Sequence, residues 1–268
     1  MDVTSGRRTR RGAAEVAGPS ERHLRMKTAR VYRALERLLG MPRRARRPAP
    51  ALDMLVATIL SQNTSDTNSY RAFTRLRQRY RRWDDVIGAP LGSIRSAIRP
   101  GGIADQKSRR IKHVLREIRR RYGRTSLASL HGQSDEAVLN ELVSLDGVGV
   151  KTAACVMLFS LRRDVFPVDT HVHRICGRLG LSPGSRTPEE TFRAMARRVP
   201  PGASHALHTN MIRFGRSVCK ANRPLCNGCP LISECSYTGR RRISRRPTPA
   251  GIRRRDFMLL DAVEGDAR

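Results

Sequence analysis

The sequence predicts an all-α protein, and three observations support that prediction. Apolar residues recur at the spacing of an amphipathic helix in residues 24–39 and 106–122. Residues 52–61 and 151–161 are apolar on nearly every side, which is typical of helices buried in a core. Alternating apolar and polar runs, which mark half-buried strands, are nearly absent.

Local signals bound the individual helices. Gly40 and Pro42 are expected to end the first helix, and Ser134 is a typical N-cap. Thr187 followed by Pro188 predicts the start of another helix, because proline is well tolerated in a first turn. Shorter helices are expected at 67–79, 83–87, 91–98 and 134–142, and a turn at 100–103.

The charge of the chain indicates an anionic polymer as its partner. The 268 residues carry 53 Lys and Arg against 23 Asp and Glu, a net charge of +30. Residues 1–50 hold +10 of this charge and residues 239–268 hold +5, which leaves +15 on residues 51–238. Only five of the basic residues are lysine, so part of the excess reflects abundant arginine. The folded part is basic nonetheless, which favours nucleic acid binding.

The two ends are expected to be tails. Residues 1–22 are rich in Arg, Gly and Ala without a period, which predicts a disordered basic N-terminal tail, and residues 239–268 form a basic C-terminal tail. No run of 18 apolar residues predicts a membrane helix, and the N-terminus lacks the apolar core of a secretory signal. We therefore expect a cytoplasmic, nucleoid-associated protein.

Residues 145–173 hold the main chemical signals. Gly147 and Gly149 predict a tight turn, and Lys151 then opens an apolar helix, so that free amides could bind a phosphate. By itself this pattern fits a plain helix–turn–helix joint equally well. Asp169 follows Lys151 by eighteen positions, within Val-Asp-Thr-His.

Four cysteines lie close together near the C-terminus. They have the spacing C-x6-C-x2-C-x5-C and are Cys219, Cys226, Cys229 and Cys235. Four thiolates at this density can hold a 4Fe–4S cluster or a zinc ion, and the spacing alone does not choose. Cys155 and Cys176 lie in apolar contexts and are expected to be core thiols.

These strings resemble the endonuclease III family of DNA glycosylases over roughly residues 30–238. That family carries a Leu-x-Gly-Val-Gly-x-Lys-Thr-Ala hairpin, a Val-Asp-Thr-His string and the same cysteine spacing, which holds a 4Fe–4S cluster. The resemblance implies a two-lobed helix–hairpin–helix glycosylase fold. Residues 51–163 would form a six-helix barrel domain, and 23–50 with 164–238 an iron–sulfur cluster domain.

The resemblance also implies a chemistry. Lys151 would attack the sugar of a flipped nucleotide and form a Schiff base, while Asp169 accepts a proton and offsets positive charge. β-Elimination would then nick the strand 3′ to the abasic site of double-stranded DNA. We expect a monomeric glycosylase and abasic lyase acting on oxidised pyrimidines. A G·T or G·U mismatch glycosylase and a non-catalytic DNA-binding protein are the alternatives.

The expected DNA contacts follow from the same resemblance. Family members fill the gap left by the flipped base with a Gln; here Asn63 takes that position and Gln62 lies one earlier. Ile103 takes the position of the apolar wedge. The further candidate DNA contacts are Gly147, Val148, Gly149, Thr152, His171 and Lys220.

Overall fold

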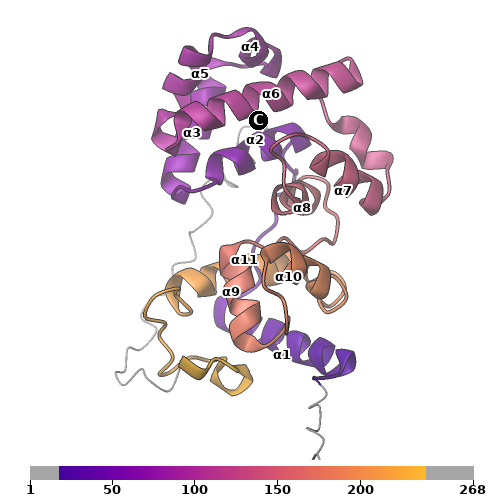
Figure 1. The fold of residues 1–268 in the computed structure, drawn as a ribbon, viewed down its shortest axis with the longest axis vertical. Helices are drawn as coiled ribbons and strands as arrows, with labels where there is room; N and C mark the ends of the chain where they lie inside the picture. Colours follow the sequence, from indigo (N-terminus) through magenta and orange to yellow (C-terminus); the bar gives the residue numbers. More distant parts are fainter. Residues whose placement is uncertain (1–17, 240–268) are drawn as a thin grey trace, which may run out of the picture.

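The computed structural model describes residues 18–239, and every regular element in that range is helical (Figure 1). The all-α prediction is thus confirmed for these residues. The α-helices are α1 (Glu21–Leu39), α2 (Ala51–Ser61), α3 (Asp66–Arg79), α4 (Trp83–Gly88), α5 (Leu91–Ile98), α6 (Ala104–Tyr122), α7 (Asp135–Val143), α8 (Val150–Phe159), α9 (Thr170–Leu179), α10 (Pro188–Met195) and α11 (Ser204–Ser217). Short 3-10 turns are η1 (Arg99–Gly101), η2 (Ala128–Gly132) and η3 (Ile232–Glu234). Within the described range no helix has the length and apolar character needed to cross a membrane.

The helices form two lobes, each around its own apolar core (Figure 1). The first lobe contains α2 to α8, and its core runs in sequence from Ala49 to Leu161. The second lobe joins α1 to α9, α10 and α11, with a core that includes Val31, Phe166 and Leu231. The described residues therefore begin in the second lobe with α1, continue through the first lobe and return to the second, so connecting segments run between the lobes.

Two buried helices form the centre of the first lobe. α2 packs along α8, and in α8 every residue from Thr152 to Phe159 is buried. This explains why the corresponding sequence runs show no polar face, since a helix surrounded by protein has none to present to water. The rigid pairing of α2 with α8 fixes their ends, and those ends carry the candidate site.

The first helix begins earlier than expected. Glu21 and Arg22, assigned from the sequence to the N-terminal tail, form the first turn of α1, and the Ser20 hydroxyl accepts a hydrogen bond from the amide of His23 at 3.3 Å. The carboxylate of Glu21 also pairs with Arg198 at 2.9 Å. An N-cap and an ion pair hold this turn in the folded lobe. Residues 1–17 and 240–268, the rest of the expected tails, lie outside the described residues.

The expected caps are confirmed and help to shape the site. The hydroxyl of Ser134 accepts from the amide of Ala137, and Thr187 forms a capping box with Glu190 at the start of α10. The capping box sets the direction of the first turn of α10, which lies beside the cavity described next.

Candidate active site

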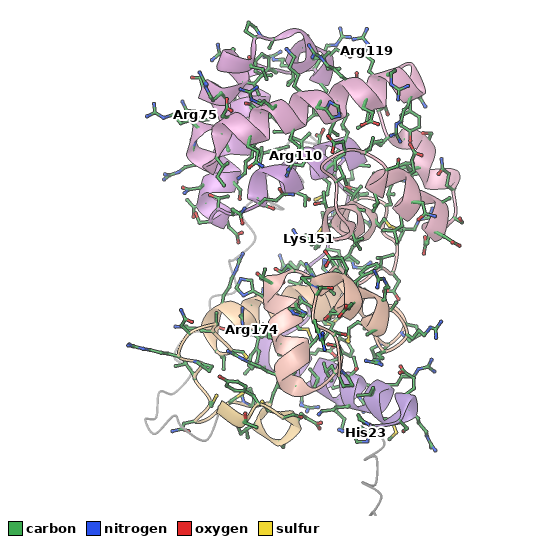
Figure 2. All side chains as sticks on the ribbon, in the orientation of Figure 1. His23, Arg75, Arg110, Arg119, Lys151 and Arg174 are labelled. Atoms are coloured by element: carbon green, nitrogen blue, oxygen red, sulfur yellow. The ribbon has the colours of Figure 1, made fainter. Side chains whose placement is uncertain are left out.

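A cavity of about 580 Å³ lies between the two lobes. The first lobe supplies the end of α2, the loop that follows it and the start of α8, and the second lobe supplies the first turns of α9 and α10 and the face of α11. Lys151 lies where the two lobes face each other (Figure 2). A space of this size is in the range of small-molecule pockets, so it can receive a single nucleobase.

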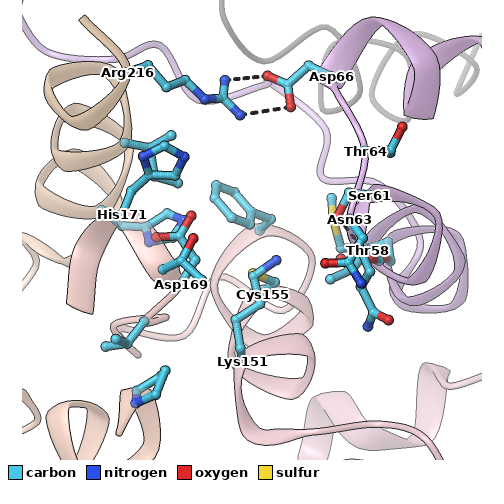
Figure 3. A pocket seen from close by; sticks show the side chains of 18 of the residues that line it. Thr58, Ser61, Asn63, Thr64, Asp66, Lys151, Cys155, Asp169, His171 and Arg216 are labelled. Atoms are coloured by element: carbon cyan, nitrogen blue, oxygen red, sulfur yellow. Dashed lines mark hydrogen bonds and ion pairs between the residues drawn. The ribbon is translucent and has the colours of Figure 1, made fainter. Parts of the chain in front are cut away.

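Lys151 and Asp169 both line this cavity (Figure 3). Lys151 stands in the first turn of α8, directly after the hairpin glycines. Asp169 is the N-cap of α9, and its Oδ1 accepts a hydrogen bond from the amide of Val172 at 2.8 Å. That bond holds the carboxylate in one orientation. The structure thus brings together the two side chains that the sequence singled out, one from each lobe.

Cys155 lies one helical turn after Lys151 and also lines the cavity. Burial raises the pKa of the Cys155 thiol, and the positive charge of the nearby Lys151 opposes this rise. The sequence predicts Cys155 only as a core thiol. Its spacing of four from Lys151 was the missed signal, because residues i and i+4 share one face of a helix.

His208 forms part of the cavity wall, although no sequence pattern indicated that it would lie there. Its Nδ1 donates to the carbonyl of Pro167 at 2.9 Å, and the rings of Phe159 and Phe166 pack edge-on against it. Burial lowers the pKa of His208 to about 4, so the ring is neutral at pH 7. With Nδ1 as the donor, Nε2 is the acceptor in this tautomer.

An ion pair joins the lobes at the edge of the cavity (Figure 3). Arg216, at the end of α11, donates from Nη1 to Oδ2 of Asp66 at 2.5 Å and from Nη2 to Oδ1 at 2.9 Å. Asp66 begins α3 in the first lobe. A bidentate pair of this kind fixes direction as well as distance, so it sets how the two walls of the cavity face each other.

The loop after α2 presents Gln62 and Asn63 differently. The Gln62 side chain accepts from Nη1 of Arg110 at 2.9 Å and donates to the hydroxyl of Thr152 at 3.4 Å. Asn63 is exposed and has a left-handed φ of 51°. The Gln62 amide is therefore tied to the first lobe, whereas Asn63 forms the tip of the loop.

The hairpin glycines are not equivalent. Gly147 has φ +81°, a conformation that favours glycine, and a Cβ built on it would lie 2.7 Å from Nε of Arg110 and would have to displace that side chain. Gly149 has an ordinary φ of −84°, and a Cβ at this position would meet no atom within 4 Å. The surface of Gly149 is therefore open to a ligand.

Two of the expected DNA contacts face inward instead. Val148 is 4% exposed and belongs to the core of the first lobe, and its amide donates to the carbonyl of Leu145. Thr152 is 3% exposed and is hydrogen-bonded to Gln62. The buried side chain of Val148 packs into the apolar core, and that of Thr152 bonds to Gln62, so both hold the hairpin against the first lobe. Gly147 and Gly149 remain as the surface of the motif.

The other expected DNA contacts are accessible or lie at the cavity. Ile103 is 50% exposed and has a left-handed φ of 45° at the start of α6. Lys220 is exposed in the cysteine loop, away from the residues that line the cavity. His171 lines the cavity, and its Nδ1 accepts from Arg174 at 3.1 Å. Burial lowers the pKa of His171.

The four C-terminal cysteines gather at one end of the second lobe. None of them forms a disulfide, and three pack against the second core. Burial, together with the charges of the other three cysteines, raises the pKa of Cys229 to about 11. Nη1 of Arg178 donates to Sγ of Cys219 at 3.4 Å. In residues 18–239 no three His, Cys, Asp or Glu side chains are placed closely enough to hold a metal ion. The chemistry of the donor set does fit one, because thiolates bind both zinc and 4Fe–4S clusters.

Comparison with known proteins decides the family. Residues 56–201 match the HhH-GPD superfamily of base excision DNA repair proteins. The chain belongs to this superfamily.

Relatives and solved structures agree with that membership. Endonuclease III of Thermotoga maritima is 36% identical over 188 residues, which cover 70% of this chain and 84% of that protein. A candidate DNA glycosylase of Arabidopsis thaliana is 40% identical over 190 residues, covering 68% of this chain and 65% of that protein. A trapped covalent complex of endonuclease III with DNA has a TM-score of 0.69 at 26% identity and covers 85% of this chain and all of that one. The resemblance to the endonuclease III family is confirmed.

Proposed function

We propose that this chain is a base excision repair DNA glycosylase with abasic lyase activity. The observation that carries the proposal is the meeting of Lys151 and Asp169 in one cavity between the lobes, directly after the hairpin. A base inside a duplex is out of reach, so such an enzyme must flip the nucleotide out, and the cavity has room for one base. Family membership and the solved covalent complex of a relative support the same reaction class.

The reaction is expected to start at Lys151. Its neutral amine attacks C1′ of the flipped nucleotide, the glycosidic bond breaks, and the base leaves with the bonding electrons and takes up a proton. Opening of the sugar gives an imine between Lys151 and C1′. Loss of a C2′ proton then expels the 3′ phosphate, which nicks the strand.

Asp169 and His208 are expected to serve this centre without bonding to the substrate. The Asp169 carboxylate accepts the proton that the amine releases and offsets positive charge on the sugar. His208 is neutral, so it adds no positive charge beside the amine. The hydrogen bond from the amide of Val172 keeps the carboxylate in place while this happens.

Asn63 and Ile103 are the residues we propose to enter the DNA. Asn63 forms the loop tip while Gln62 is tied to Arg110 and Thr152, so Asn63 is better placed to fill the gap left by the flipped base. Ile103 exposes half of its surface at the start of α6, which suits an apolar wedge against the opposite strand.

The substrate within this class is expected to be an oxidised pyrimidine. A mismatch glycosylase acting on uracil or thymine opposite guanine is the second candidate, because the Gln62–Asn63 loop departs from the pattern of the family. Duplexes with thymine glycol, dihydrouracil, uracil opposite guanine, a G·T mismatch or 8-oxoguanine separate the two. Fast excision only at the mismatches would favour the second candidate.

We further propose that the C-terminal loop holds a 4Fe–4S cluster. The ligands would be Cys219, Cys226, Cys229 and Cys235. Such a cluster would neutralise the repulsion among the thiolates and stiffen the loop that carries Lys220. The thiol set alone fits zinc as well, and the same spacing in the endonuclease III family favours iron–sulfur. The direct test is the metal content discussed below.

Borohydride trapping on duplex DNA with an abasic site tests the catalytic assignment. The wild type should give a covalent adduct and a nick, and Lys151→Gln should give neither while keeping most of its DNA affinity, since phosphates contacted elsewhere supply it. Lys27→Gln is the matched control, because that lysine lies on α1 outside the cavity. Wild-type nicking by Lys151→Gln, or an adduct at another lysine, would overturn the assignment.

A further inference from the structure

Lys107 is a buried lysine that the proposed reaction does not use. Its side chain is 4% exposed, and it lies outside the cavity that contains Lys151. Its Nζ donates to the backbone carbonyl of Leu60 at 2.8 Å and to that of Gly101 at 2.8 Å. Burial lowers the pKa of Lys107 to about 8. A buried ammonium is costly, so these two hydrogen bonds offset a real loss of hydration.

The two carbonyls belong to the segments that carry the proposed DNA-entering residues. Leu60 is in the last turn of α2, three residues before Asn63. Gly101 ends η1, two residues before Ile103. Lys107 itself follows Ile103 by one helical turn, and its amide donates to the Ile103 carbonyl at 3.1 Å. One side chain therefore connects the Asn63 loop to the Ile103 turn.

The two carbonyls lie where helices end, and such ends need a donor from elsewhere. The carbonyls in the last turn of a helix lack a partner within that helix, and lysine supplies donors only. A Cβ on Gly101 would lie 3.1 Å from Cβ of Ala72 and 3.9 Å from the Leu60 carbonyl, so the two segments already pack closely. Asn63 and Ile103 both have positive φ, a conformation that the surroundings must hold.

We propose that Lys107 is a positioning residue that fixes the distance between the Asn63 loop and the Ile103 turn, so that both enter the duplex at one nucleotide. The inference rests on the proposed function, because it assumes that these two tips enter DNA. The side chains of Asn63 and Ile103 must keep a fixed spacing to enter the DNA on both sides of one flipped nucleotide. A shift of about 1 Å in such a geometry can lower a rate roughly a hundredfold.

The same helix offers a matched control in Lys112. Lys112 is also buried, at 9% exposed, and its Nζ donates to the carbonyl of Ala89. Ala89 caps the end of α4, a segment that carries neither Asn63 nor Ile103. Loss of Lys112 removes a buried lysine–carbonyl hydrogen bond from the same lobe without changing the contacts of the Asn63 loop or the Ile103 turn.

The experiment uses one DNA strand with an abasic site in two forms. The first form is the single strand, and the second is a duplex whose complementary strand carries 2-aminopurine opposite the abasic site. Lys107→Met should slow borohydride trapping on the duplex roughly tenfold or more and leave the single strand within about twofold, because only the duplex needs a filled gap. The change in 2-aminopurine fluorescence that the wild-type protein causes on binding this duplex should also be lost in Lys107→Met. Lys112→Met should keep the wild-type ratio of the two rates. If Lys107→Met does not fold, Lys107→Gln, which has a shorter side chain and no charge, should change the ratio in the same direction.

A double variant shows whether Lys107 acts through the wedge. Ile103→Ala should also slow the duplex reaction, and the double variant with Lys107→Met should be about as slow as the slower single variant. Equal slowing of both strand forms by Lys107→Met, or fully multiplicative losses in the double variant, would overturn the proposal. Absence of any wild-type adduct on either the duplex or the single strand would instead refute the proposed function.

Discussion

At the scale of single residues, Asp169 combines a structural and a chemical task. As the N-cap of α9 it accepts from the amide of Val172, and the rest of its carboxylate faces the cavity. Asparagine is an equally good N-cap and keeps an oxygen for that amide. The substitution Asp169→Asn therefore removes the charge and leaves the helix start intact.

We expect Asp169→Asn to slow base excision more than nicking of a preformed abasic site. Excision needs the carboxylate to activate the amine and to offset charge on the sugar, whereas an abasic aldehyde is already electrophilic. The loss in excision should be on the order of 3 kcal/mol, roughly a hundredfold in rate. Single-turnover rates on a thymine glycol duplex and on its abasic counterpart measure the two steps. Equal slowing of both would argue against this role.

At the scale of elements, the two glycines of the hairpin between α7 and α8 have different roles: Gly147 is needed for folding, and Gly149 offers a surface for binding. Gly147 is enclosed by Arg110 and needs its positive φ, while Gly149 is open. Val148 anchors the turn in the core between them. The two glycines therefore have different physical reasons to be glycine, and the same substitution should separate them.

Gly147→Ala should destabilise the protein by about 1–3 kcal/mol, since a Cβ meets Arg110 and the left-handed backbone is strained. Gly149→Ala should cost at most about 1 kcal/mol of stability, the usual loss at an N-cap, yet weaken duplex binding because its backbone is where a phosphate approaches. Thermal unfolding and fluorescence anisotropy with a duplex measure the two effects. Unchanged stability in Gly147→Ala would refute the packing argument.

At the scale of the whole molecule, the two lobes depend on long-range ties. Arg216 and Asp66 join them at the cavity, and α1 packs on α11, so this helix completes the second lobe although the whole first lobe separates the two helices in sequence. The cysteine loop closes that lobe against its core, with Arg178 donating to the carbonyls of Lys220 and Ala221. A metal centre held by the four cysteines would add a covalent tie to these contacts.

Purified protein should contain about four irons and absorb as a 4Fe–4S protein. Cys226→Ser should lose the iron and much of its solubility together, because ligation is coupled to folding of the loop. Cys176→Ser is the matched control: that thiol is buried in the second core, outside the quartet, so its iron content should stay at the wild-type value. Elemental analysis checks both variants, and stoichiometric zinc with negligible iron would contradict the assignment.

The sequence by itself predicted the fold class and most helix positions, and the resemblance of two short strings to a known family singled out Lys151 and Asp169. These depend on local signals, namely helical periodicity, caps and two short strings with a fixed separation. Tertiary structure alone decided that His208 lines the cavity, that Val148 turns inward and that Lys107 connects two loops. Most of these contacts join residues distant in sequence, and the direction of a side chain is set by the elements packed around it. No local pattern carries that information.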